Sequence, residues 1–237
     1  PGLIGSLQTG YLFAHALSIS LNKELIPVNH LEGHIYSTLL RSNNDQKIKK
    51  ITYPSLSLVV SGGHTSLYFH KNETIFEIIG QTLDDALGEV FDKVARSLGL
   101  GFPGGQVIDD IFQKNNFEQL IKINIPKTEN QLDFSFSGIK TQVINLIHNY
   151  RQKNEPLNIG HLAYSFQKQA IDYLISVTKK AIKLYNPKTL TLSGGVSANS
   201  YLKSEMKKLH PNFLKPIEGY STDNGCMIAM AASILCD

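Results

Sequence analysis

Apolar residues recur at three- and four-residue steps along several segments of the chain, which is the spacing of one face of an α-helix. This spacing predicts helices over 157–184 and about 200–209, and a small-residue helix over 226–235. Near the N-terminus, an amphipathic helix is predicted by a set of residues at the same spacing, namely Leu7, Tyr11, Ala14, Leu17 and Leu21.

Short apolar runs between glycine-rich or polar turns predict buried strands at 56–60, 67–69, 75–79 and 190–192. The first two are separated by the turn at 61–65, so we expect them to form a hairpin. Residues 132–138 alternate apolar and polar side chains and predict a further strand. Strands that alternate with helices are typical of an α/β fold.

A helix is predicted over about 83–98, opened by a capping box at Thr82 and Asp85. Its apolar face carries Leu87, Val90, Phe91, Val94 and Leu98, and its other face carries Asp85, Glu89, Asp92 and Arg96. The simplest interpretation of the charged stripe is a solvated face with an ordinary pair between Asp92 and Arg96.

The segment 99–104 matches the pattern GxGxxG, but it does not predict a dinucleotide site. That fingerprint needs a strand before it and a helix directly after it, whereas this segment follows a helix and has Pro103 before its last glycine. The loop can still meet a ligand through Gly104 and Gly105, ahead of a helix expected to begin near Val107.

Composition indicates an ordinary globular protein. The 237 residues are 42% hydrophobic and 18% charged, which excludes a disordered chain. No apolar run approaches the ~18 residues of a membrane helix. The net charge of +3 permits an anionic partner without requiring one. The two cysteines form no CxxC pair, and we expect a cytoplasmic protein with reduced thiols.

His30 and His34 are the first candidates for chemistry. They are four residues apart in a predicted helix, so both imidazoles lie on one face and can reach the same divalent metal. Histidines at this spacing also occur by chance on polar surfaces, so the pair alone leaves both interpretations open.

Two strands end in the sequence Ser-Gly-Gly, at 61–63 and at 193–195. The first is compatible with a phosphate-binding loop or with a plain hairpin turn. The second leads toward a helix, whose free N–H groups suit a nucleotide better. Lys140, near another helix start, opposes the helix dipole and is a weaker candidate for an anionic ligand. Asp223 is expected locally to cap the last helix.

Seven motifs together resemble the tRNA threonylcarbamoyladenosine transferases, most closely the bacterial branch. They lie at 30–34, 60–65, 88–93, 102–105, 133–141, 192–199 and 221–225, in order over nearly the whole chain. The resemblance implies an α/β actin, sugar-kinase and Hsp70-like ATPase fold with two lobes around a nucleotide cleft. Family members have roughly a hundred residues ahead of the position of Pro1, about the size of a small domain, so we expect a truncated first lobe.

This resemblance also implies a division of the chain. Residues 1–50 would be the remnant of the first lobe with the histidine helix, and residues 51–237 the second lobe with the substrate loops. The C-terminal helix is expected to return toward the first lobe.

By resemblance, His30, His34 and Asp223 bind one divalent metal. Fe²⁺ is expected first, with Zn²⁺ or Mg²⁺ as alternatives, and two imidazoles with one carboxylate suit iron or zinc better than magnesium. The family's substrate-binding positions match Val59, Val60, Ser61, Gly62, Gly63, Asp92, Gly105, Asp109 and Asn199.

The reaction implied is transfer of a threonylcarbamoyl group from threonylcarbamoyl-AMP, an adenine nucleotide, to the N6 amine of the adenosine 3′ of the anticodon in tRNAs that read codons beginning with A. The expected partners are tRNA, a smaller paralogous subunit and a small ATPase, with no membrane. The general base is not assigned: His64 and Glu32 are the candidates for it, and Lys140 is a further candidate catalytic residue.

Two other functions remain possible at this point. One is a non-catalytic scaffold or partner-binding subunit of the same complex. The other is a metalloendopeptidase, but zincins carry Glu directly after the first His, where this chain has Leu31.

Overall fold

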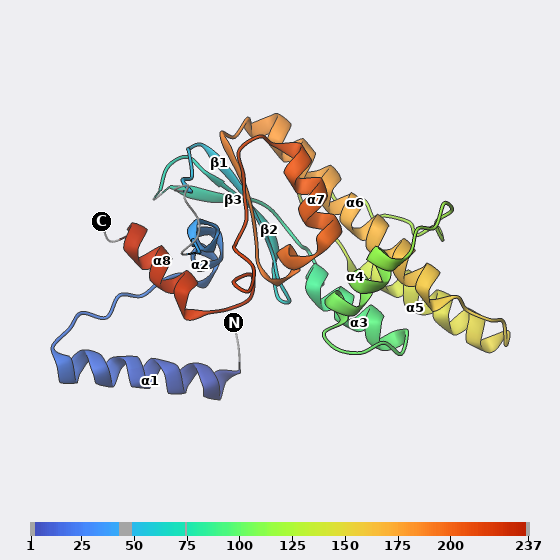
Figure 1. The fold of residues 1–237 in the computed structure, drawn as a ribbon, viewed down its shortest axis with the longest axis horizontal. Coiled ribbons are helices and arrows are strands. Elements are labelled where there is room, and N and C mark those ends of the chain that lie inside the picture. Colours follow the sequence, from blue (N-terminus) through green and yellow to red (C-terminus); the bar gives the residue numbers. More distant parts are fainter. Residues whose placement is uncertain (1–2, 43–48, 74, 236–237) are drawn as a thin grey trace.

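The computed structural model describes residues 3–42, 49–73 and 75–235. A five-stranded mixed sheet lies at its centre, with helices on both faces (Figure 1). The sheet has the order β3-β2-β1-β4-β5 and consists of β1 Ser55–Val60, β2 Thr65–His70, β3 Phe76–Gln81, β4 Thr189–Ser193 and β5 Phe213–Leu214. The predicted hairpin is confirmed, because β1 and β2 pair antiparallel.

The pairing of β1 with β4 decides where the ligand loops lie. These strands are parallel, with Val59 opposite Ser193. Carboxyl ends of parallel strands meet at the same edge of a sheet. The two Ser-Gly-Gly segments, more than a hundred residues apart in the chain, therefore leave the sheet side by side.

Eight α-helices and two short 3₁₀ helices are found in the described part of the chain. They are α1 Ile4–Leu21, α2 His30–Tyr36, η1 Ser37–Leu39, α3 Leu87–Ser97, α4 Gly104–Lys114, α5 Ser137–Gln152, α6 Ile159–Tyr185, η2 Gly195–Ala198, α7 Ser200–Leu209 and α8 Gly225–Leu235.

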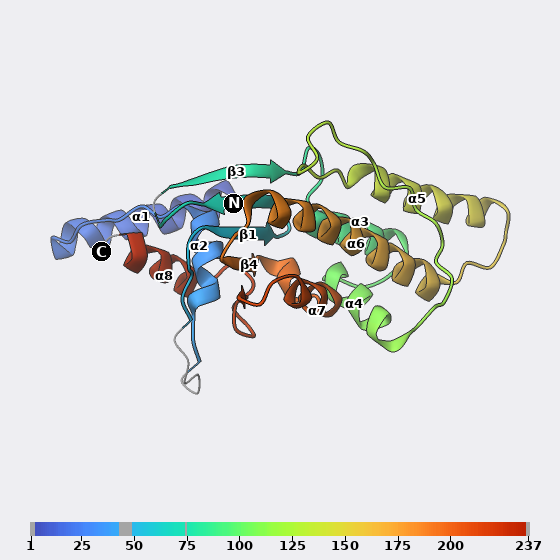
Figure 2. The same ribbon diagram turned by 90° about the horizontal axis from the view of Figure 1, so that it is seen from above.

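The larger core lies between the sheet and the long helices. Leu56, Leu58 and Val60 alternate along β1, so all three point to one face of the sheet. They pack in one cluster with the apolar faces of α3, α5 and α6, and Figure 2 shows these helices extending together beyond the end of the sheet.

A smaller core lies on the opposite face, beneath α2 and α8. Its buried residues are Ile35, Tyr36, Ile51, Val59, Tyr68 and Ala231. The C-terminal helix α8 thus packs beside α2, which belongs to the segment expected to be the first-lobe remnant. The domain boundary at residue 50 stays a prediction.

The prediction that the first helix is amphipathic is wrong. α1 forms as expected, but none of its side chains is buried, and Figure 1 shows it apart from the sheet layers. Leu12, Phe13 and Ile19 are exposed as well as Leu7 and Tyr11, so apolar residues surround the helix. The apolar residues at helical spacing, from Leu7 to Leu21, are only part of an apolar surface that runs around the helix, so they do not define one apolar face.

Three local predictions are also corrected. The helix expected from about 83 begins at Leu87 without a side-chain cap, and Thr82 Oγ1 donates to the carbonyl of Asp85 instead of closing a capping box. Residues 132–138 form a single bridge, between Phe134 and Thr82, and not a strand. The helix expected near Val107 already begins at Gly104.

Within the described residues, no helix combines the length and the apolar character that crossing a membrane would require.

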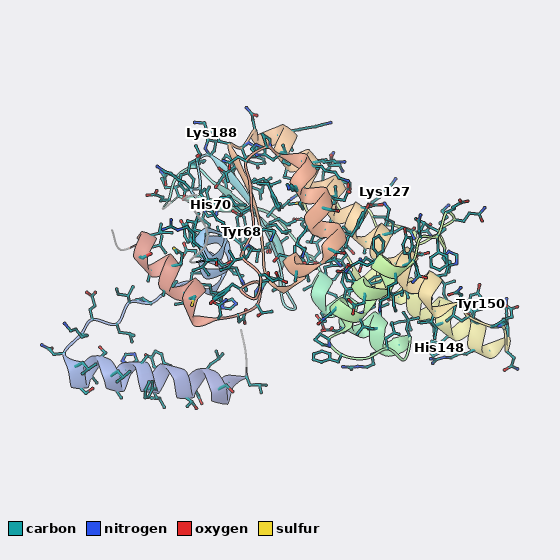
Figure 3. The ribbon with its side chains drawn as sticks, in the orientation of Figure 1. Tyr68, His70, Lys127, His148, Tyr150 and Lys188 are labelled. Carbon is teal, nitrogen blue, oxygen red and sulfur yellow. The ribbon has the colours of Figure 1, made fainter. Side chains whose placement is uncertain are left out.

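His70 on β2 is a buried titratable group, and Figure 3 shows it with Tyr68 at the sheet. Its ring stacks on Phe76 with the centroids 5.1 Å apart, and its Nε2 has no hydrogen-bond partner among the described residues. Burial lowers the pKa of His70 from 6.5 to about 4. The folded protein therefore holds this imidazole in its neutral form.

We expect this burial to make the stability depend on pH. Between pH 4 and 6.5 the unfolded chain binds a proton that the folded chain does not, so the contribution of His70 is complete above pH 6.5 and declines as the pH falls toward 4. From pH 7.5 to pH 5 the loss is about 2 kcal/mol. Urea unfolding of wild type and His70→Phe at both pH values measures it.

The His70→Phe variant should lose about that much less stability on acidification than wild type. His148→Phe, at an exposed histidine on α5 (Figure 3), is the control and should follow wild type. Equal pH dependence in His70→Phe and wild type would contradict the assignment.

Candidate functional site

The helix α2 is fixed at its start by Asn29. The side chain of Asn29 accepts hydrogen bonds from the backbone N–H of Leu31 at 2.8 Å and of Glu32 at 3.4 Å. Such a cap satisfies N–H groups that have no partner within the helix. His30 is therefore the first residue of an ordered turn, and His34 lies one turn further on.

Gly33 lets α8 approach this helix closely. A Cβ atom at position 33 would lie 2.9 Å from Cδ1 of Ile228 and 3.4 Å from Cγ of Met227. The absence of a side chain thus brings the start of α8, and with it the loop that carries Asp223, next to the two histidines.

Asp223 does not cap α8, contrary to the local expectation. The side chain of Asn224 accepts the hydrogen bond from the backbone N–H of Met227, at 3.0 Å. The carboxylate of Asp223 is therefore left to face His30 and His34.

These three side chains converge on one point. Asp223 Oδ1 lies 3.5 Å from His30 Nε2 and 3.1 Å from His34 Nε2, and one ligand atom from each residue lies within 4.8 Å of the other two. The imidazole centroids are 4.8 Å apart with the rings nearly perpendicular. Side-chain exposure rises from 2% at His34 through 26% at His30 to 60% at Asp223, so the group is open on one side.

The protonation state of the two histidines is compatible with metal binding. Burial lowers the pKa of His30, against an opposing effect of Asp223. Burial and then the neighbouring His30 lower the pKa of His34. Both rings are thereby kept in the neutral form that binds metals.

The buried ring nitrogen of His34 supports the same conclusion. His34 Nε2 lies 3.1 Å from Asp223 Oδ1 and makes no well-formed hydrogen bond with a described residue. A bound cation would take both atoms as ligands and so satisfy the buried nitrogen. Two imidazoles and a carboxylate with open positions fit Fe²⁺ or Zn²⁺ better than Mg²⁺.

His64 approaches this group and Glu32 does not join it. His64 contributes to lowering the pKa of both His30 and His34, and its Nδ1 is buried without a partner among the described residues. Burial lowers the pKa of His64 itself. Glu32 lies on α2, and burial raises its pKa, but its carboxylate lies outside the three-residue cluster.

The two Ser-Gly-Gly junctions meet at the edge of the sheet, but they are built differently. The first is a closed hairpin turn, in which Ser61 N–H donates to the carbonyl of His64 and His64 N–H donates to Ser61 Oγ. The second turns through Gly194 at φ +88°, where a Cβ atom would lie 2.4 Å from the carbonyl oxygen of Val60. Gly195 then leads toward α7, and its Cβ position is 3.8 Å from Thr222 Cγ2.

The predicted substrate residues at the end of β1 differ in their exposure to solvent. Val59 and Val60 are fully buried, with their side chains in the smaller and the larger core. Gly62 and Gly63 are exposed, and no atom of the described residues, apart from their chain neighbours, lies within 4 Å of their Cβ positions. The open part of this loop is therefore its glycine backbone.

The remaining predicted substrate residues surround the start of α4 and of α7. Asp92 accepts a hydrogen bond from the backbone N–H of Gly104 at 2.8 Å, and this bond holds the loop before Gly105. The expected ion pair between Asp92 and Arg96 is not found in the described structure. Asp109 is buried and accepts from Gln167, Gln113 and both the N–H and the hydroxyl of Ser200. Asn199 caps α7 through Leu202 N–H. Their roles toward a nucleotide stay predictions.

Lys140 is already engaged. Its ammonium group pairs with Asp85, which also pairs with Lys93 at 3.1 Å, and both lysines lower the pKa of Asp85. Sequence reasoning missed the neighbouring Asp84, which binds the hydroxyls of Ser135 and Ser137 at 2.6 Å each and so fixes the start of α5. The two adjacent aspartates, Asp84 and Asp85, were the available signal in the sequence. The serines that Asp84 binds lie some fifty residues further along the chain, so local sequence could not identify them.

Solved structures confirm the predicted fold class. The chain superimposes on full-length HypF in its phosphate- and nucleotide-bound form with a TM-score of 0.63 at 14% identity, covering 93% of this chain and 44% of that one. HypF from T. kodakarensis gives a TM-score of 0.65 at 12% identity, covering 95% and 38%. At these identities the similarity concerns the fold, which is of the actin and sugar-kinase-like ATPase class.

Sequence relatives confirm the predicted family. The tRNA N6-adenosine threonylcarbamoyltransferase of Mycoplasma mobile is 56% identical over 232 residues, and that of Mycoplasmopsis agalactiae is 52% identical over 232 residues. In both comparisons 98% of this chain and 72% of the relative are covered. The family profile described as tRNA N6-adenosine threonylcarbamoyltransferase matches residues 1–230. The chain therefore belongs to the tRNA N6-adenosine threonylcarbamoyltransferase family.

Proposed function

We propose that this chain transfers a threonylcarbamoyl group from threonylcarbamoyl-AMP to the N6 amine of the adenosine 3′ of the anticodon in tRNAs that read codons beginning with A. Family membership supports the threonylcarbamoyl transfer to tRNA adenosine. The observation that carries the finer proposal is the convergence of His30, His34 and Asp223 close to the loops at the ends of β1 and β4.

The acceptor sets the chemical problem. The lone pair of an adenine amine is delocalised into the ring, so the amine is a poor nucleophile, while AMP is a good leaving group. The site then accelerates the reaction mainly by positioning the two substrates and by stabilising developing charge. We propose that the exposed glycine backbone at 62–63 and the junction that leads into α7 hold the adenylate.

We propose one divalent metal, Fe²⁺ before Zn²⁺ and Mg²⁺, held by His30, His34 and Asp223. When bound, such an ion acts as a Lewis acid and template for acyl or phosphoryl oxygens. The protein holds the two imidazoles neutral by burial and supplies the carboxylate from the loop before α8.

Of the two candidates for the general base, His64 and Glu32, we favour His64. Its imidazole is kept neutral by burial, its Nδ1 has no partner among the described residues, and it lies within electrostatic reach of Asp223. Lys140 is paired with Asp85, and Glu32 lies outside the cluster. His64 would accept the proton that leaves the N6 amine as the new N–C bond forms.

We further propose that the chain works in the cytoplasm with a smaller paralogous subunit and a small ATPase. Incubation of the chain with these partners, Fe²⁺, ATP, threonylcarbamoyl-AMP and unmodified tRNA should yield N6-threonylcarbamoyladenosine, detected by mass spectrometry of the digested tRNA. His30→Ala should lower the yield about 100-fold. Wild-type yield from His30→Ala, or cleavage of casein that depends on His30, would refute the proposal.

A further inference from the structure

A cavity lies outside the metal cluster, between the start of α7 and the segment 215–222. Its volume is about 300 Å³, and its wall contains Lys203 and Lys215 with Glu218 as the acidic residue. This volume can hold a phosphate group with several waters, since each water occupies about 30 Å³ in the liquid. The cavity was not foreseen from the sequence.

The positive charge of this cavity is not balanced by ion pairs. In the described structure, neither Lys203 nor Lys215 has a carboxylate at ion-pair distance, and Lys215 Nζ donates to the carbonyl of Pro216 at 3.4 Å. Burial lowers the pKa of Lys215, as do the nearby charges of Lys203 and Lys49, and Glu218 opposes them. Two neighbouring ammonium groups and one carboxylate therefore act on Lys215, so the surroundings of this lysine are net positive.

The start of α7 does not add free positive potential to the cavity. Its first residue, Ser200, donates its N–H and its hydroxyl to the buried carboxylate of Asp109, and Lys203 lies one turn along the helix. Ser197 in the wall is 1% exposed, and its hydroxyl has no hydrogen-bond partner among the described residues. The hydroxyl of Ser197 is thus a hydrogen-bond donor without an acceptor, in the same wall as Lys203 and Lys215.

We propose that this cavity binds a backbone phosphate of the tRNA substrate. The inference rests on the proposed function. Thr222 in the wall directly precedes Asp223, so a phosphate held here lies beside the metal cluster. None of the residues of the wall is aromatic, which favours a phosphate contact over stacking of a base.

Binding of fluorescent tRNA, measured by anisotropy without metal, ATP or partners, tests this proposal. The Lys203→Gln, Lys215→Gln double variant should raise the Kd about tenfold near 0.1 M salt and reduce the slope of log Kd against log salt by about one or two. Lys207→Gln is the matched control, because Lys207 is exposed on the same helix and lies outside the wall. It should keep the wild-type Kd within about twofold.

Wild-type affinity and slope in the double variant would overturn the proposal. Inorganic phosphate and AMP are titrated in parallel. If the double variant lost their binding and kept that of tRNA, the cavity would serve a free phosphate ligand, which would overturn the assignment to RNA. This experiment measures binding and no modification step. Loss of tRNA binding in the double variant would therefore support a phosphate site in the cavity even if the wild-type chain failed to modify tRNA.

Discussion

Asp223→Asn is expected to lower the affinity of the chain for Fe²⁺ about 100-fold or more, since losing even an outer partner of a metal ligand costs 10–100-fold. Asparagine keeps the shape of the side chain and removes the anionic oxygen that lies 3.1 Å from His34 Nε2 and 3.5 Å from His30 Nε2. Anaerobic calorimetric titration of the apo-protein with Fe²⁺, repeated with Zn²⁺, measures this loss directly.

The exposure of Asp223 makes this variant informative. Its carboxylate is 60% exposed and does not cap α8, so the fold should survive the change, and urea unfolding without metal checks this. His30→Ala removes a second ligand and should give a similar loss. His148→Ala removes an exposed histidine on α5 and should bind like wild type. If Asp223→Asn bound both metals with wild-type affinity, the three residues would not form the metal site.

Gly194→Ala is expected to destabilise the fold by about 4 kcal/mol, a large part of the 5–15 kcal/mol that stabilises an ordinary domain. Two effects add. Gly194 has φ +88° and ψ 165°, a region of backbone conformation that essentially only glycine adopts. A Cβ atom would also lie 2.4 Å from the carbonyl oxygen of Val60, which is held in the sheet. Urea unfolding of both proteins measures the difference.

Gly62→Ala is a matched control, since Gly62 is the corresponding glycine of the other Ser-Gly-Gly segment. Its backbone is not in the left-handed region, and in the described part of the chain no atom beyond its neighbours lies within 4 Å of its Cβ position. The cost should stay below about 1 kcal/mol. Equal destabilisation by both variants would contradict the different geometry of the two junctions.

The secondary structure was largely predictable, because its signals are local. Apolar spacing located the helices at 159–185 and 200–209, and short apolar runs located β1, β2 and β4. Predictions failed where residues distant in the sequence determine the local structure. Phe134 forms a single bridge with Thr82, so the alternating segment around it is not a strand. Asp85 pairs with Lys93 and Lys140 from two helices, so it does not close a capping box.

The candidate site was predictable in part. His30 and His34 follow from a four-residue spacing, which places two side chains on one face of any helix. Asp223 was assigned by resemblance, since its own surroundings in the sequence suggested a helix cap. The cavity between Lys203 and Lys215 had no sequence signal, because the two lysines are twelve residues apart and a strand intervenes.

By itself, the sequence determined the elements, the histidine pair and, through the order of its motifs, the family. The tertiary structure decided what each glycine junction does and where the carboxylate lies. Parallel pairing of β1 with β4 brings Gly194 against Val60, and Gly33 admits α8 beside α2 so that Asp223 reaches the histidines. The physical reason is that such contacts join residues more than a hundred positions apart, whose approach depends on packing of the whole fold and not on local spacing.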